Sequence, residues 1–360
     1  MAVIARRLPW MDPVWPLLPQ LATRGVHAVL LHGMRGIGKT SLALDFAEAL
    51  LCGAPLPDGH GCGRCEECRL TAAFSHPDLR WVLPQALAER LLPQVEEEEP
   101  AGAGPAADPG EGEGGKPARS SREIRVDQVR ELSDFLGIAA YRGGRRVILL
   151  APAEAMNPIA ANTLLKMLEE PPPATIFVLV SDALDEVLPT VRSRCVMVQV
   201  PPPAPEACIH WLEGQGVDDA PAALALASGA PLAALAAAGD RALARQADAA
   251  LYRLLEQGPS LTMGQATALI GRDPPVAACL RLMQCWAFDL LLFRTAGVVR
   301  YHPQHEARIG KLAALVRMTA LWRWCDALKA ANAARDHPLN ARLVIESLLA
   351  TYAEVFDDRR

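Results

Sequence analysis

The chain has 360 residues and a net charge of −5, with 51% hydrophobic, 21% charged and 5% aromatic residues. This length suggests two or three domains with large cores, and the dominance of Ala and Leu favours helices. The negative charge argues against a protein whose whole surface binds nucleic acid, although local contacts through helix N-termini or a few arginines stay open.

Strands and helices are expected to alternate through the first 200 residues. Such alternation predicts a largely parallel α/β sheet, and a glycine-rich turn over 33–38 joins the first strand to the first helix. The predicted strands span 27–32, 76–84, 146–150, 175–180 and 195–200. The predicted helices of this part span 39–51, 124–136 and 162–170.

One segment interrupts this pattern. Residues 93–121 consist mainly of Pro, Gly, Ala and Glu, with no aromatic residue. Such a segment cannot bury enough apolar surface to offset the entropy lost on ordering, so we predict a disordered insertion there.

The proline-rich stretch over 201–205 marks the end of the α/β module, which we place at 1–202. No strand is predicted beyond it. We expect a small helical unit over 203–246 and a larger helical bundle over 247–360. Aromatic residues at helix-like spacing are expected mainly in the core of that bundle. They are Trp286, Phe288, Trp322 and Trp324.

Neither a targeting signal nor a membrane segment is predicted. No run of about 18 or more uncharged apolar residues occurs, so we expect no membrane span. Arg6 and Arg7 are not followed by an apolar stretch, which argues against a secretory signal. We therefore expect a cytoplasmic protein.

The segment from Gly33 to Thr40, GMRGIGKT, fits the phosphate-loop pattern G-x-x-x-x-G-K-[ST]. Glycines let backbone N–H groups face a phosphate, and the following helix adds its positive end. Lys39 would reach the β- and γ-phosphates, and Thr40 would bind Mg²⁺. The predicted nucleotide-binding residues are Gly33, Gly36, Gly38, Lys39, Thr40 and Ser41, with ATP or ADP and Mg²⁺ as the candidate ligand.

Four of the nine cysteines are spaced C-x9-C-x2-C-x2-C, at Cys52, Cys62, Cys65 and Cys68. Two residues between cysteines let both thiolates reach one tetrahedral ion, so the pattern predicts a closed structural zinc site. Unrelated thiols, or a redox pair at Cys65 and Cys68, are the alternatives. The other five cysteines lie among apolar residues and are expected to pack in the core.

Four motifs follow one another along the chain: the phosphate loop, the cysteine cluster, NTLLKMLEEP over 162–171 and Ser193-Arg194-Cys195. In this order they resemble the bacterial clamp-loader AAA+ ATPases of DNA polymerase III. The resemblance is strong over about residues 8–200 and weaker beyond. Pro9-Trp10 and the sequence HPLN over 337–340 look like the delta-prime branch of that family.

The resemblance implies an AAA+ P-loop module, a small helical lid and an all-α C-terminal collar domain. It also implies a hetero-pentamer with gamma/tau and delta subunits, which acts on a sliding clamp and on primer-template DNA. Arg194 matches the arginine finger, which points out of its own subunit and stabilises charge on the γ-phosphate bound by a neighbour.

The chain departs from the motor subunits of this family at two acids. The motor subunits carry Asp-Glu after the strand over 146–150, where this chain has Ala151 and Pro152, and Glu154 lies two residues further on. Ser181 is positioned to sense the γ-phosphate, whereas the segment over 228–232 offers no basic sensor. We therefore expect a stationary subunit that does not hydrolyse ATP.

Three other functions fit the sequence less well. An active AAA+ ATPase would need unconventional acids. A P-loop nucleotide kinase would need acceptor-binding Arg and Asp groups soon after the loop, where the cysteine cluster lies instead. A free-standing zinc module that binds DNA would need more basic charge than residues 59–68 carry.

Overall fold

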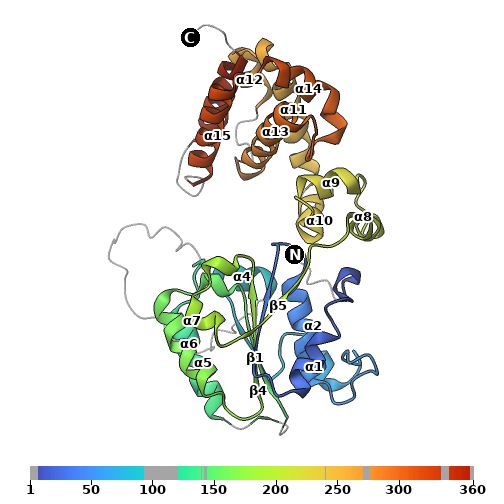
Figure 1. Ribbon diagram of the computed structural model, residues 1–360, viewed down its shortest axis with the longest axis vertical. Coiled ribbons are helices and arrows are strands. Elements are labelled where there is room, and N and C mark those ends of the chain that lie inside the picture. The colour runs from blue at the N-terminus through green and yellow to red at the C-terminus, as the bar shows by residue number, and fades with distance from the viewer. Residues whose placement is uncertain are drawn as a thin grey trace, which may run out of the picture. The chain divides into compact units, whose positions relative to one another are not determined.

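A computed structural model divides the chain into two compact units, residues 1–202 and 203–360 (Figure 1). It describes residues 7–92, 121–138, 140–141, 144–239, 241–270, 276–333 and 340–356. The predicted disordered insertion lies outside the described residues, apart from Ser121.

The first unit is built on a five-stranded parallel sheet in the order β2-β3-β4-β1-β5. Its central strands are buried along almost their whole length, as continuous apolar runs require when both faces are covered. The strands are β1 (Ala28–His32), β2 (Leu79–Val82), β3 (Arg146–Leu150), β4 (Thr175–Ser181) and β5 (Val196–Gln199). All five predicted strands are thereby confirmed.

Helices cover both faces of this sheet. In Figure 1, α5, α6 and α7 lie on one face, and α1 and α2 lie on the other. The helices are α1 (Leu17–Thr23), α2 (Lys39–Leu51), α3 (Glu66–Ala72), α4 (Gln85–Leu91), α5 (Val126–Gly137), α6 (Pro158–Glu169) and α7 (Pro189–Arg192). Short 3-10 turns form η1 (Pro9–Met11) and η2 (Ala153–Ala155).

Two helices begin at other residues than predicted. Helix α6 starts four residues early, because the Asn157 side chain accepts a hydrogen bond from the Ala160 amide at 2.8 Å and Pro158 occupies the first turn. Helix α5 starts two residues late, because Ile124 forms a bridge with Met156 instead.

The second unit is helical throughout its described residues. Its helices are α8 (Pro205–Gly214), α9 (Ala220–Leu226), α10 (Pro231–Gly239), α11 (Arg241–Gln257), α12 (Met263–Leu269), α13 (Val276–Ala296), α14 (Glu306–Leu315), α15 (Met318–Ala333) and α16 (Ala341–Ala353). The boundary expected between 246 and 247 falls inside α11. The predicted fold class, an α/β P-loop module followed by all-α segments, is confirmed.

The aromatic residues of the bundle divide between core and surface. Trp286 and Trp324 are fully buried, whereas Phe288 is 38% and Trp322 is 53% exposed. The core prediction is wrong for the latter two. Residues two positions apart on a helix point to different sides, so the burial of Trp286 and Trp324 turns these neighbours outward.

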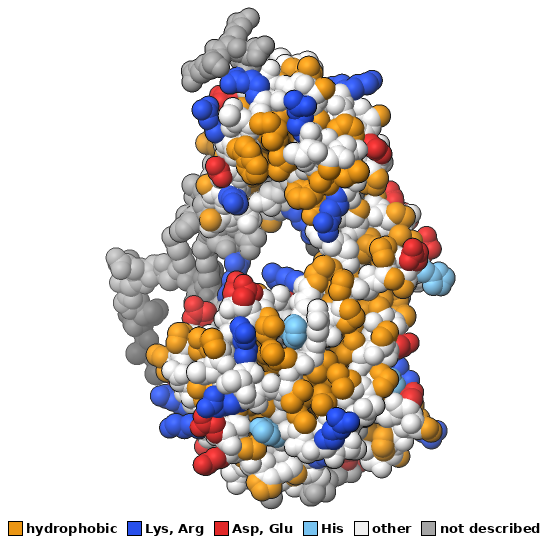
Figure 2. Space-filling model, in the orientation of Figure 1, with side chains coloured by type: hydrophobic (Ala, Val, Ile, Leu, Met, Phe, Trp, Pro, Cys, Tyr) orange, Lys and Arg blue, Asp and Glu red, His pale blue; other side chains and the backbone are white. Residues whose placement is uncertain are grey.

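Helix α13 is long and apolar enough to cross a membrane, but half of its most apolar stretch is buried inside the unit. It packs against α14 and α15 and contributes Leu280, Met283, Trp286 and Leu290 to the core. These contacts are those of a central core helix. On the face shown in Figure 2, basic and acidic side chains are interspersed.

Candidate functional site

The phosphate loop leaves the sheet where the strand order reverses. β1 lies between β4 and β5, with His32 opposite Ser181 on one side and opposite Gln199 on the other. The chain passes from β1 to the far edge of the sheet, returns through β3 and β4, and then adds β5 beyond β1. Parallel α/β sheets bind ligands at such a switch point, outside the carboxyl ends of the strands.

Backbone geometry explains the glycines of the loop. Gly33 has a φ of +151°, and a Cβ added there would lie 2.4 Å from the Val200 carbonyl oxygen. Gly36 and Gly38 have φ values of 79° and 100°, which glycine adopts readily and other residues rarely do. Gly38 then forms the N-cap of α2. The backbone of the loop therefore lies in close contact with Val200, just after β5.

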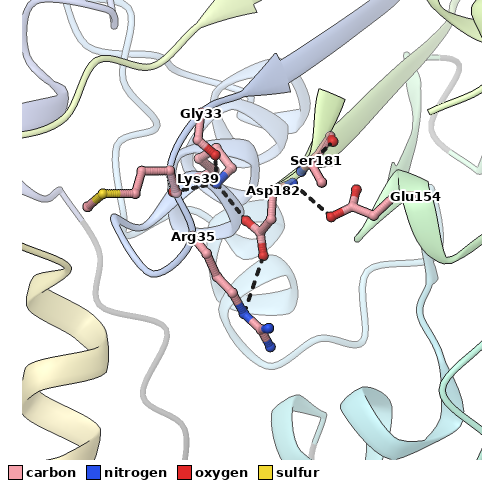
Figure 3. Close-up of polar contacts among 8 residues, drawn as sticks. Gly33, Arg35, Lys39, Glu154, Ser181 and Asp182 are labelled. Carbon is pink, nitrogen blue, oxygen red and sulfur yellow. Dashed lines mark hydrogen bonds and ion pairs between the residues drawn. The ribbon is translucent and has the colours of Figure 1, made fainter. Parts of the chain in front are cut away.

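Lys39 lies inside the loop, 3% exposed. Its ammonium group donates to the backbone oxygens of Gly33 and Met34, each at 2.7 Å, and to Asp182 Oδ1 at 2.6 Å. Figure 3 shows the Asp182 carboxylate between Lys39 and Arg35, whose Nε lies 3.6 Å from Asp182 Oδ2. Sequence reasoning missed Asp182, since no motif marks it.

A tryptophan from the amino-terminal segment supports the same loop. Trp10 is buried, and its indole Nε1 donates to the Ile37 carbonyl oxygen at 2.7 Å. The Arg7 amide, just before it, donates to Asp45 Oδ2 on α2 at 3.0 Å. Trp10 therefore has a structural role, because its indole holds the backbone of the phosphate loop.

The end of β3 carries the apolar residues expected from the sequence. Ala151 is buried there and Pro152 follows it, so neither offers a carboxylate. Glu154, on η2, points to the turn after β4, where its Oε1 accepts the Asp182 amide at 2.9 Å (Figure 3). Ser181 is fully buried, and its hydroxyl accepts the Ala183 amide at 3.2 Å.

Arg194 follows α7, and its contacts lie within its own unit. Its guanidinium pairs with Glu169 at the end of α6 and donates to the Thr190 carbonyl oxygen at 2.9 Å. The Arg194 side chain is 33% exposed and that of Glu169 is 49% exposed. The predicted finger is therefore held at the surface by an exposed carboxylate.

The four predicted zinc ligands meet in space. Cys52 ends α2, Cys65 is the N-cap of α3, and all four sulfur atoms lie within 4.8 Å of one another. Cys52 and Cys65 Sγ are 3.8 Å apart, and Cys62 and Cys68 Sγ are 3.9 Å apart. Zn–S bonds of about 2.3 Å at tetrahedral angles place sulfur atoms about 3.8 Å apart, so the cluster fits this ion.

Backbone N–H groups also favour thiolates in this cluster. The amides of Cys62, Cys65 and Cys68 each donate to the sulfur of another cysteine, at 3.3–3.4 Å. Hydrogen bonds from the Arg64 and Cys65 amides lower the pKa of Cys62 to about 6. Burial raises the pKa of Cys68, which a bound cation would have to offset.

The remaining cysteines are separate from this cluster. Burial raises the pKa of Cys208 and of Cys285 to about 11, which keeps both thiols protonated at neutral pH. Cys208, Cys279 and Cys285 are buried, as predicted, whereas Cys195 and Cys325 are half-buried.

Comparison with known proteins identifies related sequences. A family model described as DNA polymerase III, delta subunit, matches residues 20–204. The chain is 33% identical to DNA polymerase III subunit delta' of Pseudomonas aeruginosa over 369 residues, which cover 96% of this chain and 97% of that protein. It is 32% identical to subunit delta' of Escherichia coli over 237 residues, which cover 64% of this chain and 60% of that protein.

Among solved structures, a DNA polymerase III gamma subunit-related protein from Thermotoga maritima aligns with 95% of this chain and 100% of its own, at a TM-score of 0.43 and 16% identity. The resemblance drawn from the motifs is confirmed by the sequence matches. The chain therefore belongs to the delta' family of DNA polymerase III subunits.

Proposed function

We propose that this chain is a clamp-loader subunit that retains a phosphate loop but does not hydrolyse ATP by itself. The observation that carries this proposal is the pairing of an intact loop with Ala151 and Pro152 at the end of β3. In P-loop ATPases an aspartate holds Mg²⁺ and a further polar group orients the attacking water. Neither an Ala methyl nor a Pro ring can perform either task.

Arg194 is proposed to act on a neighbouring subunit. A guanidinium fork near the γ-phosphate stabilises charge in the transition state of phosphoryl transfer. The side chain is partly exposed and is held by Glu169, which is itself half exposed, so both groups can separate without breaking a buried core. Surface pairs of this kind contribute little stability, about 0–1 kcal/mol, and a phosphate can therefore compete for the arginine.

Family membership supports a proposal for the wider assembly. We propose that residues 203–246 form a lid and residues 247–360 a collar that joins the chain to gamma/tau and delta subunits. The complex would open and load a sliding clamp on primer-template DNA in the cytoplasm. Phe288 and Trp322 are exposed aromatic residues of this collar, a residue type enriched in protein interfaces.

The four cysteines are proposed to hold structural zinc. Their sulfur spacing fits the ion, and four thiolates leave no open coordination position. A bound ion would join the end of α2, which begins at the phosphate loop, to the start of α3. Its role would be to fix this part of the fold, with no part in catalysis.

Single-turnover ATP hydrolysis by the isolated chain tests the no-hydrolysis proposal. We expect a rate indistinguishable from that of the Lys39→Ala variant. A second candidate, an active ATPase, is raised by Asp182 and Glu154, because these carboxylates lie beside the loop. Hydrolysis at the rate of a motor subunit, lost in Lys39→Ala, would overturn our proposal and support that candidate.

A further inference from the structure

The phosphate loop of this chain already contains an anion. Lys39 has three N–H donors, and all three have acceptors: two loop carbonyl oxygens at 2.7 Å and Asp182 Oδ1 at 2.6 Å. A phosphate oxygen that approached this ammonium would have to displace one of them. Asp182 is the only charged group among the three, and it carries the same sign as the phosphate.

The sheet register delivers Asp182 to this place. His32 of β1 pairs with Ser181 of β4, so the next residues, Gly33 and Asp182, leave the sheet side by side at its carboxyl edge. Glu154 fixes the turn by accepting the Asp182 amide at 2.9 Å. The carboxylate is therefore positioned by the backbone of a central strand.

Two cations of the loop hold this carboxylate (Figure 3). Lys39 is 3% exposed, so its pair with Asp182 is poorly screened by water. Arg35 approaches the second oxygen from the solvent side, with a side chain that is 89% exposed. A charge pair with one buried partner and a second cation is harder to displace than a pair on the open surface.

We propose that the Asp182 carboxylate occupies the phosphate site of its own chain and thereby lowers the affinity of this loop for nucleotide. The carboxylate neutralises Lys39 and competes with the β- and γ-phosphates for it. This inference deepens the proposed function, because a loop filled by its own side chain needs neither magnesium nor hydrolysis to keep its shape. Asp182, which follows β4, thus lowers the affinity of the phosphate loop for nucleotide.

The test is the affinity of the full chain for ATP with Mg²⁺, measured by isothermal titration calorimetry. Asp182→Asn keeps the shape of the side chain and removes its charge, and we expect it to bind ATP at least tenfold more tightly than the wild type. Asp182→Ala should do the same. Asp185→Asn removes an exposed charge three residues away and should leave the affinity unchanged.

Addition of Lys39→Ala to Asp182→Asn should abolish the gain, because the freed ammonium is what the phosphate would bind. Circular dichroism and tryptophan fluorescence identify a variant that has failed to fold. If folded Asp182→Asn and Asp182→Ala bind ATP no more tightly than the wild type, the inference is overturned. That result would leave the no-hydrolysis proposal standing, since single-turnover hydrolysis by the wild type tests the latter separately.

Discussion

A buried carboxylate in the helical unit gives the sharpest stability prediction. Asp289 on α13 is fully buried, and it accepts hydrogen bonds from the backbone amides of Arg300, Tyr301 and His302 at 2.9–3.1 Å. The His302 ring nitrogen Nδ1 lies 2.8 Å from the same carboxylate. One side chain thus fixes residues 300–302 in the connection between α13 and α14.

The Asp289→Ala substitution would leave these donors without an acceptor. Arg300 is exposed and its amide can turn to water, but His302 is fully buried, so its amide and ring nitrogen would stay unsatisfied. At about 1–3 kcal/mol for each of these two buried donors, the expected loss is about 2–6 kcal/mol of unfolding free energy.

Urea unfolding followed by tryptophan fluorescence measures this loss, because Trp286 and Trp324 lie in the same core. With a slope of about 2 kcal/mol per molar urea, the midpoint should fall by roughly 1–3 M. Asp326→Ala removes an exposed aspartate of α15 and should change stability by less than about 0.5 kcal/mol. If Asp289→Ala behaved like Asp326→Ala, the reasoning from buried hydrogen bonds would be refuted.

Two further predictions concern the first unit. In urea unfolding, Gly33→Ala should lower the stability of this unit by at least about 1–2 kcal/mol more than Gly25→Ala does. Both substitutions replace a glycine of positive φ, but only the new methyl group at 33 meets a carbonyl oxygen. Equal losses in the two variants would contradict this reasoning. Cys65→Ser should remove bound zinc from the purified chain, whereas Cys325→Ser should retain it. Inductively coupled plasma mass spectrometry measures the zinc content of both variants. A full zinc content in Cys65→Ser would argue against the four-cysteine site.

The sequence was sufficient to predict the parts of the fold that depend on local chemistry. The central strands β1, β3 and β4 are short, mainly apolar runs bounded by turn residues. The glycine spacing of the loop reflects backbone angles that only glycine adopts easily. The cysteine spacing predicted a cluster that the structure brings together within 4.8 Å. In each case the residues that matter are close in sequence or belong to one motif.

What could not be predicted depends on residues far apart in the chain. The contact of Asp182 with Lys39 spans 143 positions and requires the register of β4 on β1. The bond from Trp10 to Ile37 likewise depends on how the amino-terminal segment packs. By contrast, the start of α6 at Pro158 could have been predicted from the sequence, because Asn157 and Pro158 form an ordinary helix start.

The proposed action of Arg194 on the ATP site of a neighbouring subunit allows the most direct test of the proposed function. The measurement is DNA- and clamp-stimulated ATP hydrolysis by the reconstituted loader, in single turnover, with Arg194→Ala in place of the wild type. We expect a loss of roughly tenfold or more at the adjacent motor site. Arg145→Ala, which removes an exposed arginine just before β3, should leave the rate unchanged. A loader that keeps its full rate with Arg194→Ala would contradict the account.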